Sequence, residues 1–91
     1  MGSEGFRVIV SDSAIRNLDK MDGSVRRLVV AYLEKRLEGI ADPRSLGKWL
    51  VGERAGQWRY RVGDYRILAK IRDAEIVIYV FKIGHRRDVY N

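Results

Sequence analysis

The last third of the chain gathers the side chains best suited to binding an anion. Residues 59–91 carry a net charge of +4, against +2 for residues 1–58, within a total of +6. The basic residues of this segment are Arg59, Arg61, Arg66, Lys70, Arg72, Lys82, Arg86 and Arg87. Guanidinium groups bind phosphate through two parallel hydrogen bonds. The sequence therefore predicts a polyanionic partner, with nucleic acid as the first candidate.

Composition narrows the chemistry that is open to this chain. Its 91 residues fit a single domain, residues 1–91, and 46% of them are hydrophobic, which is enough for a core. The sequence has no cysteine, which excludes disulfides and thiolate nucleophiles, and its single histidine excludes a multi-histidine metal site. We therefore expect no cofactor. With no signal peptide and no apolar run of membrane-spanning length, we expect a cytoplasmic protein without a membrane partner.

Hydrophobic periodicity predicts the elements that must position these residues. Residues 6–10 alternate as in a strand. Two helices should follow, the second with an apolar stripe over residues 25–37. Residues 41–56 predict a loop that Trp49 and Leu50 anchor to the core. The remaining strands are expected at 57–62, 65–72 and 75–83. This order predicts an α+β domain: a small, mostly antiparallel four-stranded sheet in β-α-α-β-β-β order, with two N-terminal helices packed on one face.

Two turns set the register of the last three predicted strands. A two-residue turn at 63–64 places Arg61 opposite Arg66, and a two-residue turn at 73–74 places Lys70 opposite Val77. One face is then apolar and carries Trp58, Tyr60, Val62, Ile67, Ala69, Ile71, Ile76, Ile78 and Val80. The opposite face carries Arg59, Arg61, Arg66, Lys70 and Arg72, together with Leu68, Tyr79 and Phe81.

A face with five basic residues can serve binding or only solubility. A solvated surface is the more common explanation for a single run of charge. Here Arg61 faces Arg66, and like charges directly opposite each other destabilise a sheet. Departures of this kind are most frequent at functional sites. Arginines beside aromatic rings also suit RNA, because guanidinium groups bind phosphates and rings stack on bases. The pattern therefore favours a nucleic-acid-binding face.

The C-terminal tail brings further candidates to this face. Gly84 allows the chain to turn, so that the following residues could fold back beside the arginines. Those residues include His85, Arg86, Arg87 and Tyr90. Taken singly, a histidine here is more commonly a surface residue, and a tyrosine near the end of a chain more commonly an anchor.

Two segments of the sequence are similar to a known toxin family. They are residues 58–68, WRYRVGDYRIL, and residues 84–90, GHRRDVY. With the length and the order of elements, they resemble the RelE toxins of bacterial and archaeal toxin–antitoxin systems, within the RelE/ParE superfamily, over nearly the whole chain. The resemblance implies a microbial-RNase-like fold and a ribosome-dependent, metal-independent endoribonuclease that inhibits translation. Such an enzyme cuts mRNA in the ribosomal A site by 2′-hydroxyl attack on the adjacent phosphate, and a RelB-like antitoxin holds it inactive.

The resemblance also implies roles for individual residues. Arg66 and Arg86 match family arginines that act on the scissile phosphate, and Tyr90 matches a tyrosine that stacks on a base or assists proton transfer. Arg59 and Arg61 stand where some members have lysines. An arginine keeps its proton, so these two can bind phosphate or stabilise charge but cannot act as a base. The base stays open, with the one histidine a candidate. The predicted catalytic set is Arg66, Arg86, Tyr90 and Arg61, and the predicted substrate-binding set is Arg59, His85, Arg87, Lys70 and Phe81.

Two other functions stay open at this point. A ParE-like toxin would share the fold but inhibit DNA gyrase without ribonuclease chemistry. A catalytically inactive member would bind RNA or the ribosome without cutting. The combination of Arg66, Arg86 and Tyr90 favours the ribonuclease over the gyrase inhibitor. The basic face suits either function.

Overall fold

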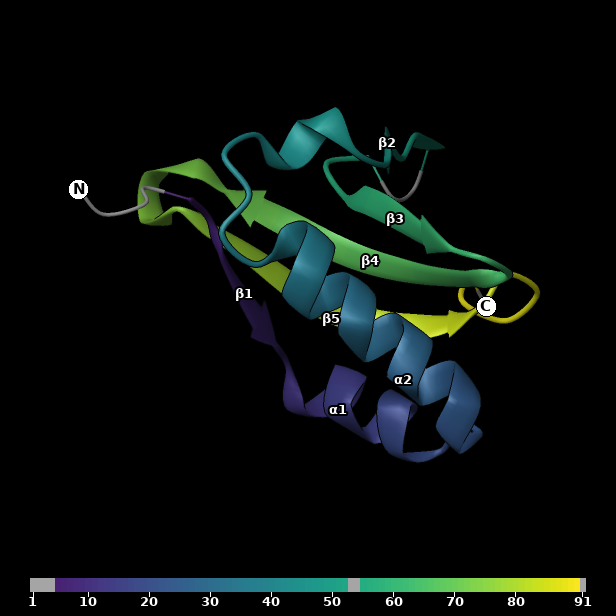
Figure 1. Ribbon diagram of the computed structural model, residues 1–91. Coiled ribbons are helices and arrows are strands. Elements are labelled where there is room, and N and C mark those ends of the chain that lie inside the picture. Colours follow the sequence, from purple (N-terminus) through teal and green to yellow (C-terminus); the bar gives the residue numbers. More distant parts are fainter. Residues whose placement is uncertain (1–4, 53–54, 91) are drawn as a thin grey trace.

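The computed structural model describes residues 5–52 and 55–90, which form one five-stranded sheet and two helices (Figure 1). The strands are β1 (Arg7–Val10), β2 (Lys48–Trp49), β3 (Trp58–Val62), β4 (Tyr65–Arg72) and β5 (Val77–His85). The helices are α1 (Asp12–Asp19) and α2 (Gly23–Tyr32), the latter continued by a π-helical turn over Leu33–Leu37. The expectations for residues 1–4, and for residues 53–54 of the predicted loop, lie outside the described residues.

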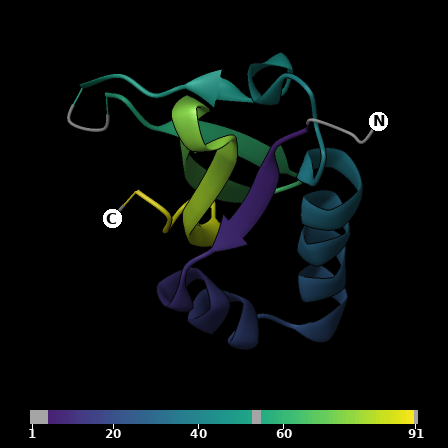
Figure 2. The same cartoon turned by 90° about the vertical axis from the view of Figure 1, so that its left-hand side faces the viewer.

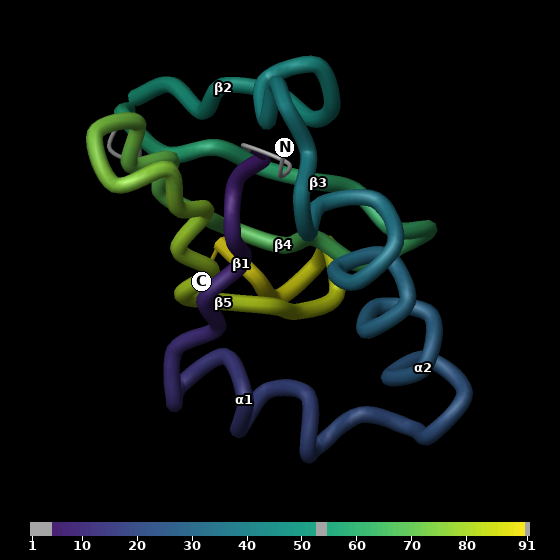
Figure 3. Tube along the Cα trace, turned by 60° about the vertical axis from the view of Figure 1, so that its left-hand side comes forward, coloured from purple at the N-terminus to yellow at the C-terminus, as the bar shows by residue number. Residues whose placement is uncertain are grey.

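The sheet is mixed and has the order β1-β5-β4-β3-β2. β1 runs parallel to β5, and the other neighbours are antiparallel. Figure 3 shows β1 beside β5, with α1 and α2 on the same side of the sheet. The predicted four-stranded sheet is wrong by one strand, because β2 pairs with the outer edge of β3. Two residues are too few to produce an alternating pattern, so periodicity does not predict this strand.

The position of Trp49 in β2 also corrects its expected role. Its side chain is 56% exposed, and its ring lies against Trp58, with 5.4 Å between the ring centroids. Leu50, the next residue, is half-buried. Trp49 therefore covers part of β3 from outside, and it does not anchor the loop in the core.

One face of the sheet packs on α1 and α2, as predicted. The Ser11 hydroxyl accepts a hydrogen bond from the first turn of α1, and the Asp22 carboxylate does the same for α2. The core between these layers consists of Ala14, Leu18, Val29, Leu33, Leu37, Tyr60, Ile67, Ala69, Ile78, Val80 and Ile83. Within the described residues, no helix has the length and apolar character needed to cross a membrane. Since the core takes one face of β3, β4 and β5, the other face is left for a functional site.

The first hairpin has the predicted register. Val62 pairs with Tyr65, and Arg61 lies opposite Arg66. Gly63, the first residue of the two-residue turn, has a φ of +58°, a conformation that is strained for residues with a side chain. Because the turn is so short, β3 and β4 can pair in one register only, and this register places Arg61 opposite Arg66.

The second hairpin does not have the predicted register. Lys70 pairs with Tyr79 and not with Val77, because a 3₁₀ turn over Asp73–Glu75 delays the start of β5 by two residues. Ile76 ends this turn with a φ of +55° and is 41% exposed, so it does not join the apolar face. A bulge opposite Leu68/Ala69 then leaves Phe81 without a partner. As a result Gly84, and not Phe81, lies opposite Arg66.

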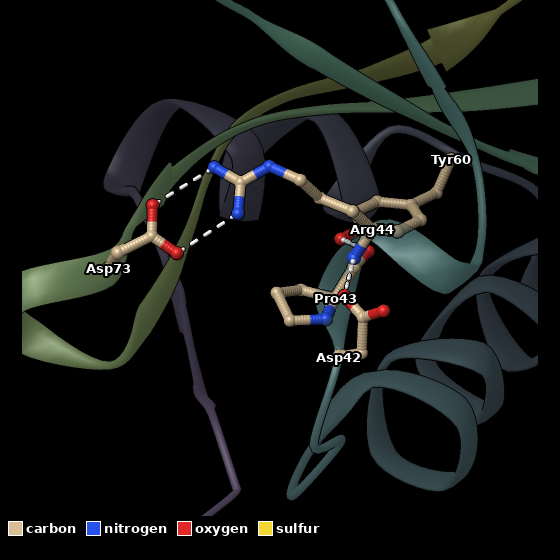
Figure 4. A network of polar contacts seen from close by, with 5 residues as sticks. All are labelled: Asp42, Pro43, Arg44, Tyr60 and Asp73. Carbon is tan, nitrogen blue, oxygen red and sulfur yellow. Dashed lines mark hydrogen bonds and ion pairs between the residues drawn. The ribbon is translucent and has the colours of Figure 1, made fainter.

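A polar network holds the segment before β2 on the sheet (Figure 4). The Arg44 guanidinium donates two hydrogen bonds to the Asp73 carboxylate, at 2.9 and 3.0 Å, and thereby lowers the pKa of Asp73. The Tyr60 hydroxyl donates to the Pro43 carbonyl oxygen at 2.7 Å, and burial raises the pKa of this tyrosine. These bonds join the segment to the β4–β5 turn and to β3, and so determine where β2 begins.

Candidate active site

Three arginines lie together on the sheet face that the helices leave open. Arg59 and Arg61 belong to β3 and alternate with the buried Tyr60, and Arg66 belongs to β4 directly opposite Arg61. Arg59 and Arg66 are half-buried, whereas Arg61 is exposed. With Arg86 of the tail, these residues form a group that we call the arginine cluster.

The electrostatic environment of Arg66 shows how close the cluster residues are. Burial lowers the pKa of Arg66, and the positive charges of Arg61, Arg59 and Arg86 lower it further. The nearby Tyr90 raises the pKa of Arg66. The guanidinium still keeps its proton, since arginine stays charged at any ordinary pH. Mutual repulsion among these groups is a cost that an anion placed between them would relieve.

Backbone contacts hold Arg66 close to the β3–β4 turn. One of its terminal nitrogens, Nη1, donates to the carbonyl oxygens of Gly63 and Tyr65, both at 3.0 Å. Its guanidinium group is therefore partly positioned before any ligand binds, which reduces the entropy lost on binding.

The tail folds back over the cluster and packs on Gly84. Val89, which is only 1% exposed, covers this glycine, and a Cβ atom there would meet the Val89 side chain at 3.5 Å, an ordinary contact distance. The amide of Val89 donates to the His85 carbonyl oxygen at 2.9 Å, which closes the turn. Figure 2 shows the tail on the side of the sheet away from α2. This fold places the Tyr90 hydroxyl 3.2 Å from the Nη1 atom of Arg59, which donates to it.

Asp64 ties Arg86 to the β3–β4 turn. The Arg86 amide donates to the Asp64 carbonyl oxygen at 2.8 Å, and the Arg86 Nε atom lies 3.8 Å from the Asp64 carboxylate. Both side chains are more than half exposed, so the ion pair itself is weak. The backbone bond is what brings Arg86 to the same end of the sheet as Arg66.

The structure does not bring His85 to the cluster. Residues alternate along β5, so His85 projects to the face opposite that of Gly84, and its ring meets the Tyr65 ring at 5.4 Å between centroids. Its Nδ1 atom accepts a hydrogen bond from the Arg87 amide at 3.1 Å. His85 lines a different pocket, of about 410 Å³, next to Lys20 and Asp22.

Lys70 and Phe81 also lie apart from the cluster. Lys70 is four residues beyond Arg66 on β4, a separation of roughly 13 Å. Its Nζ atom stands 5.9 Å from the centroid of the Phe81 ring. Arg87 is exposed in the tail. The structure therefore brings together five predicted site residues: the four arginines of the cluster (Arg59, Arg61, Arg66 and Arg86), with Tyr90 beside them.

Residues 8–90 of the chain match the family model of the ParE toxin of type II toxin–antitoxin systems, parDE. The chain belongs to the RelE/ParE superfamily of type II toxins. It is 31% identical over 85 residues to Toxin RelG of Mycobacterium tuberculosis, covering 93% of this chain and 95% of that protein. This confirms the superfamily that the sequence resemblance predicts.

Solved structures show the same fold for this toxin. The RelBE2 toxin–antitoxin complex of Mycobacterium tuberculosis matches with a TM-score of 0.81 and 30% identity, covering 92% of this chain and 94% of that one. The intact RelBE toxin–antitoxin complex of Escherichia coli matches with a TM-score of 0.58 and 15% identity, covering 89% and 96%. The second likeness concerns the fold alone.

Two residues beside the arginine cluster of this toxin were not predicted from the sequence. The sequence pattern predicts Asp64 only as a turn residue, but its carbonyl oxygen also holds Arg86. Lys48 stood in a predicted loop, but β2 places it opposite Arg59. Lys48, Arg59 and Arg61 line a pocket of about 210 Å³ with Tyr32, Leu46 and Gly47, which we call the flanking pocket. No sequence signal could have found it, because it depends on the pairing of a two-residue strand.

A second hollow of this toxin is unsuited to a polyanion. It has a volume of about 270 Å³ and lies between β1 and the helices. Its lining is apolar except for Glu34 and Glu38, whose carboxylates would repel phosphate. Among the described residues no group of three or more histidine and acidic side chains could hold a metal ion.

Proposed function

We propose that this toxin is a ribosome-dependent endoribonuclease that cuts mRNA in the ribosomal A site and so inhibits translation in the cytoplasm. One observation carries the proposal: the tail places the Tyr90 hydroxyl beside Arg59, within the group of charges around Arg66. Fixed positive charges stabilise the charge that develops on the phosphate during cleavage of a phosphodiester, and a hydroxyl can donate a proton to the leaving oxygen. A surface that serves only solubility has no need to keep these like charges together.

The proposed reaction uses the substrate's own nucleophile. The 2′-oxygen forms a bond to the adjacent phosphorus and loses its proton to water, while the bond from phosphorus to the 5′-oxygen breaks. Arg66, Arg86 and Arg61 stabilise the added negative charge on the phosphate oxygens. Tyr90 gives a proton to the leaving 5′-oxygen and regains one from water. The products are a 2′,3′-cyclic phosphate and a 5′-hydroxyl, and the reaction needs no metal ion, because guanidinium groups supply the positive charge.

The site supports a need for the ribosome. The cluster residues themselves include no base, since the arginines keep their protons, and His85 lies on the other face of the sheet. In-line attack requires the 2′-oxygen, the phosphorus and the 5′-oxygen to be aligned, and such alignment contributes a large part of the rate. We propose that the ribosome supplies it by holding the A-site codon.

The family model that matches is described as a ParE toxin, so gyrase inhibition is the second candidate. The two functions separate in a pair of assays. We expect primer extension on mRNA translated in a purified system to show cuts within codons, and supercoiled DNA treated with gyrase to show no added cleavage. Intact mRNA together with gyrase-dependent DNA cleavage would contradict the proposal. Ribosome binding without cuts would mark an inactive member.

We further propose that a RelB-like antitoxin is the partner of this toxin. The matched relatives in the two solved complexes are toxins bound to antitoxins. A cationic face is readily covered by an acidic amphipathic segment. We expect such a segment to cover Arg61, Arg66 and Arg86, or to displace the tail at 84–91. A crystal structure of the complex checks this, and an antitoxin that leaves both regions untouched would contradict it.

A further inference from the structure

The flanking pocket is a cationic hollow that adjoins the arginine cluster. It lies between the end of α2, the segment leading into β2 and the edge of β3. Three of its lining side chains are positively charged, Lys48, Arg59 and Arg61, and none is acidic. The Tyr32 ring and Leu46 supply apolar surface. At about 210 Å³ it is smaller than the ~300–1,000 Å³ typical of sites for drug-sized molecules, and fits one base or one phosphate group.

A second pair of like charges lies at this pocket. Lys48 on β2 is the register partner of Arg59 on β3, just as Arg61 is the partner of Arg66 across β3 and β4. Each such pair costs stability. The Arg61–Arg66 pair is explained by the scissile phosphate, but Lys48 does not belong to the cluster. Its position opposite Arg59 points to a second anionic group of the ligand.

The pocket is built rigidly. The Trp58 indole donates to the Leu46 carbonyl oxygen at 2.7 Å, which holds the wall of the pocket on β3. Gly47 has a φ of +81°, and a Cβ atom there would lie 2.3 Å from the Arg59 carbonyl oxygen. Only glycine allows the chain to approach so closely. The hollow is therefore formed before a ligand arrives, which favours binding.

We propose that the flanking pocket binds the nucleotide next to the scissile phosphate, with Lys48 contacting the phosphate of that nucleotide. This inference rests on the proposed function and extends it. Arg59 and Arg61 belong to both sites, so an RNA strand with one phosphate among the arginines must place a neighbouring nucleotide at the pocket. Tyr32 and Leu46 provide the apolar wall against which its base lies.

The test measures binding of a short single-stranded RNA to toxin that carries Arg66→Ala, which slows cutting by about 10²–10³-fold. Into this background we introduce Lys48→Ala or, as a matched control, Lys35→Ala. Lys35 is an exposed lysine of the π-helical turn, outside both sites. Affinity is recorded over a series of salt concentrations, because each lost phosphate contact lowers the slope of log affinity against log salt by about 0.7 for single strands. Thermal unfolding verifies that each variant is folded.

We expect Lys48→Ala to weaken binding roughly 3- to 10-fold at low salt and to lower the slope by about 0.7, with Lys35→Ala unchanged. Lys48→Arg should restore the slope. Equal slopes for Lys48→Ala and Lys35→Ala would overturn the pocket assignment, even if the wild-type toxin cuts mRNA on ribosomes. Conversely, a slope lost only in Lys48→Ala, from a toxin that never cuts mRNA, would support the pocket and refute the proposed ribonuclease.

Discussion

Arg66→Ala is expected to lower the rate of mRNA cleavage on ribosomes by about 10²–10³-fold. The guanidinium of Arg66 lies at the centre of the cluster and is already held by Gly63 and Tyr65, so it stabilises the charged transition state without reorganising. Single-turnover cleavage of ribosome-bound mRNA measures the effect. Arg66→Lys keeps the charge but loses the two-bond geometry, and it should fall between the wild type and the alanine variant.

Stability separates this role from a structural one. Arg66→Ala removes one member of a like-charge pair, so its thermal midpoint should equal or exceed that of the wild type. Arg72→Ala is the matched control, since Arg72 is exposed at the far end of β4, stacked 5.2 Å from the Tyr79 ring centroid. The control should cut at nearly the wild-type rate. An Arg66→Ala variant that cuts as fast as the control would contradict the assigned role.

Tyr90→Phe is expected to lower the cleavage rate by about 10²-fold, the lower range for loss of a general acid. The change removes the hydroxyl that Arg59 contacts at 3.2 Å and keeps the ring. Tyr90→Ala should then add little to the loss, because the ring is not the group that transfers the proton. The same single-turnover assay measures both variants, with Tyr79→Phe as a control from the far part of the face.

The opposite pattern would assign Tyr90 differently. If Tyr90→Phe cuts at the wild-type rate and only Tyr90→Ala fails, the ring stacks on a base and the proton comes from elsewhere. That result would leave the arginines in place but remove proton donation by Tyr90 from the mechanism.

Much of the fold could be predicted because local signals agreed with it. The stripe over residues 25–37 required a helix, and the two-residue turn at Gly63 fixed the register that pairs Arg61 with Arg66. The second hairpin could not be predicted. Ile76 adopts a left-handed conformation that is rare for a β-branched residue, and one unpaired residue in β5 moves all later partners.

The candidate site divides in the same way. The alternation of residues along β3 and the two-residue turn were enough to predict that Arg59 and Arg61 share one face of the sheet. Arg86 reaches them through the bond of its amide to the Asp64 carbonyl oxygen, and Tyr90 follows Val89, which packs on Gly84; no periodicity reports either contact. Lys48 joins them only through β2, a strand too short to recognise. The sequence pattern thus predicts the arginines on β3 and β4, whereas tertiary packing determines that Arg86, Tyr90 and Lys48 lie beside them.

The most direct test of the proposed activity uses ribosomes programmed with a defined mRNA whose A site is empty. Two messages are compared, one all-ribose and one with a single 2′-deoxynucleotide at the position of cleavage. We predict that the toxin cuts the all-ribose message within the A-site codon, only when ribosomes are present, and leaves a 5′-hydroxyl on the downstream fragment. The deoxy message should stay intact, because the nucleophile is missing. Cleavage of the deoxy message, or an all-ribose message that stays intact on ribosomes, would contradict the proposal.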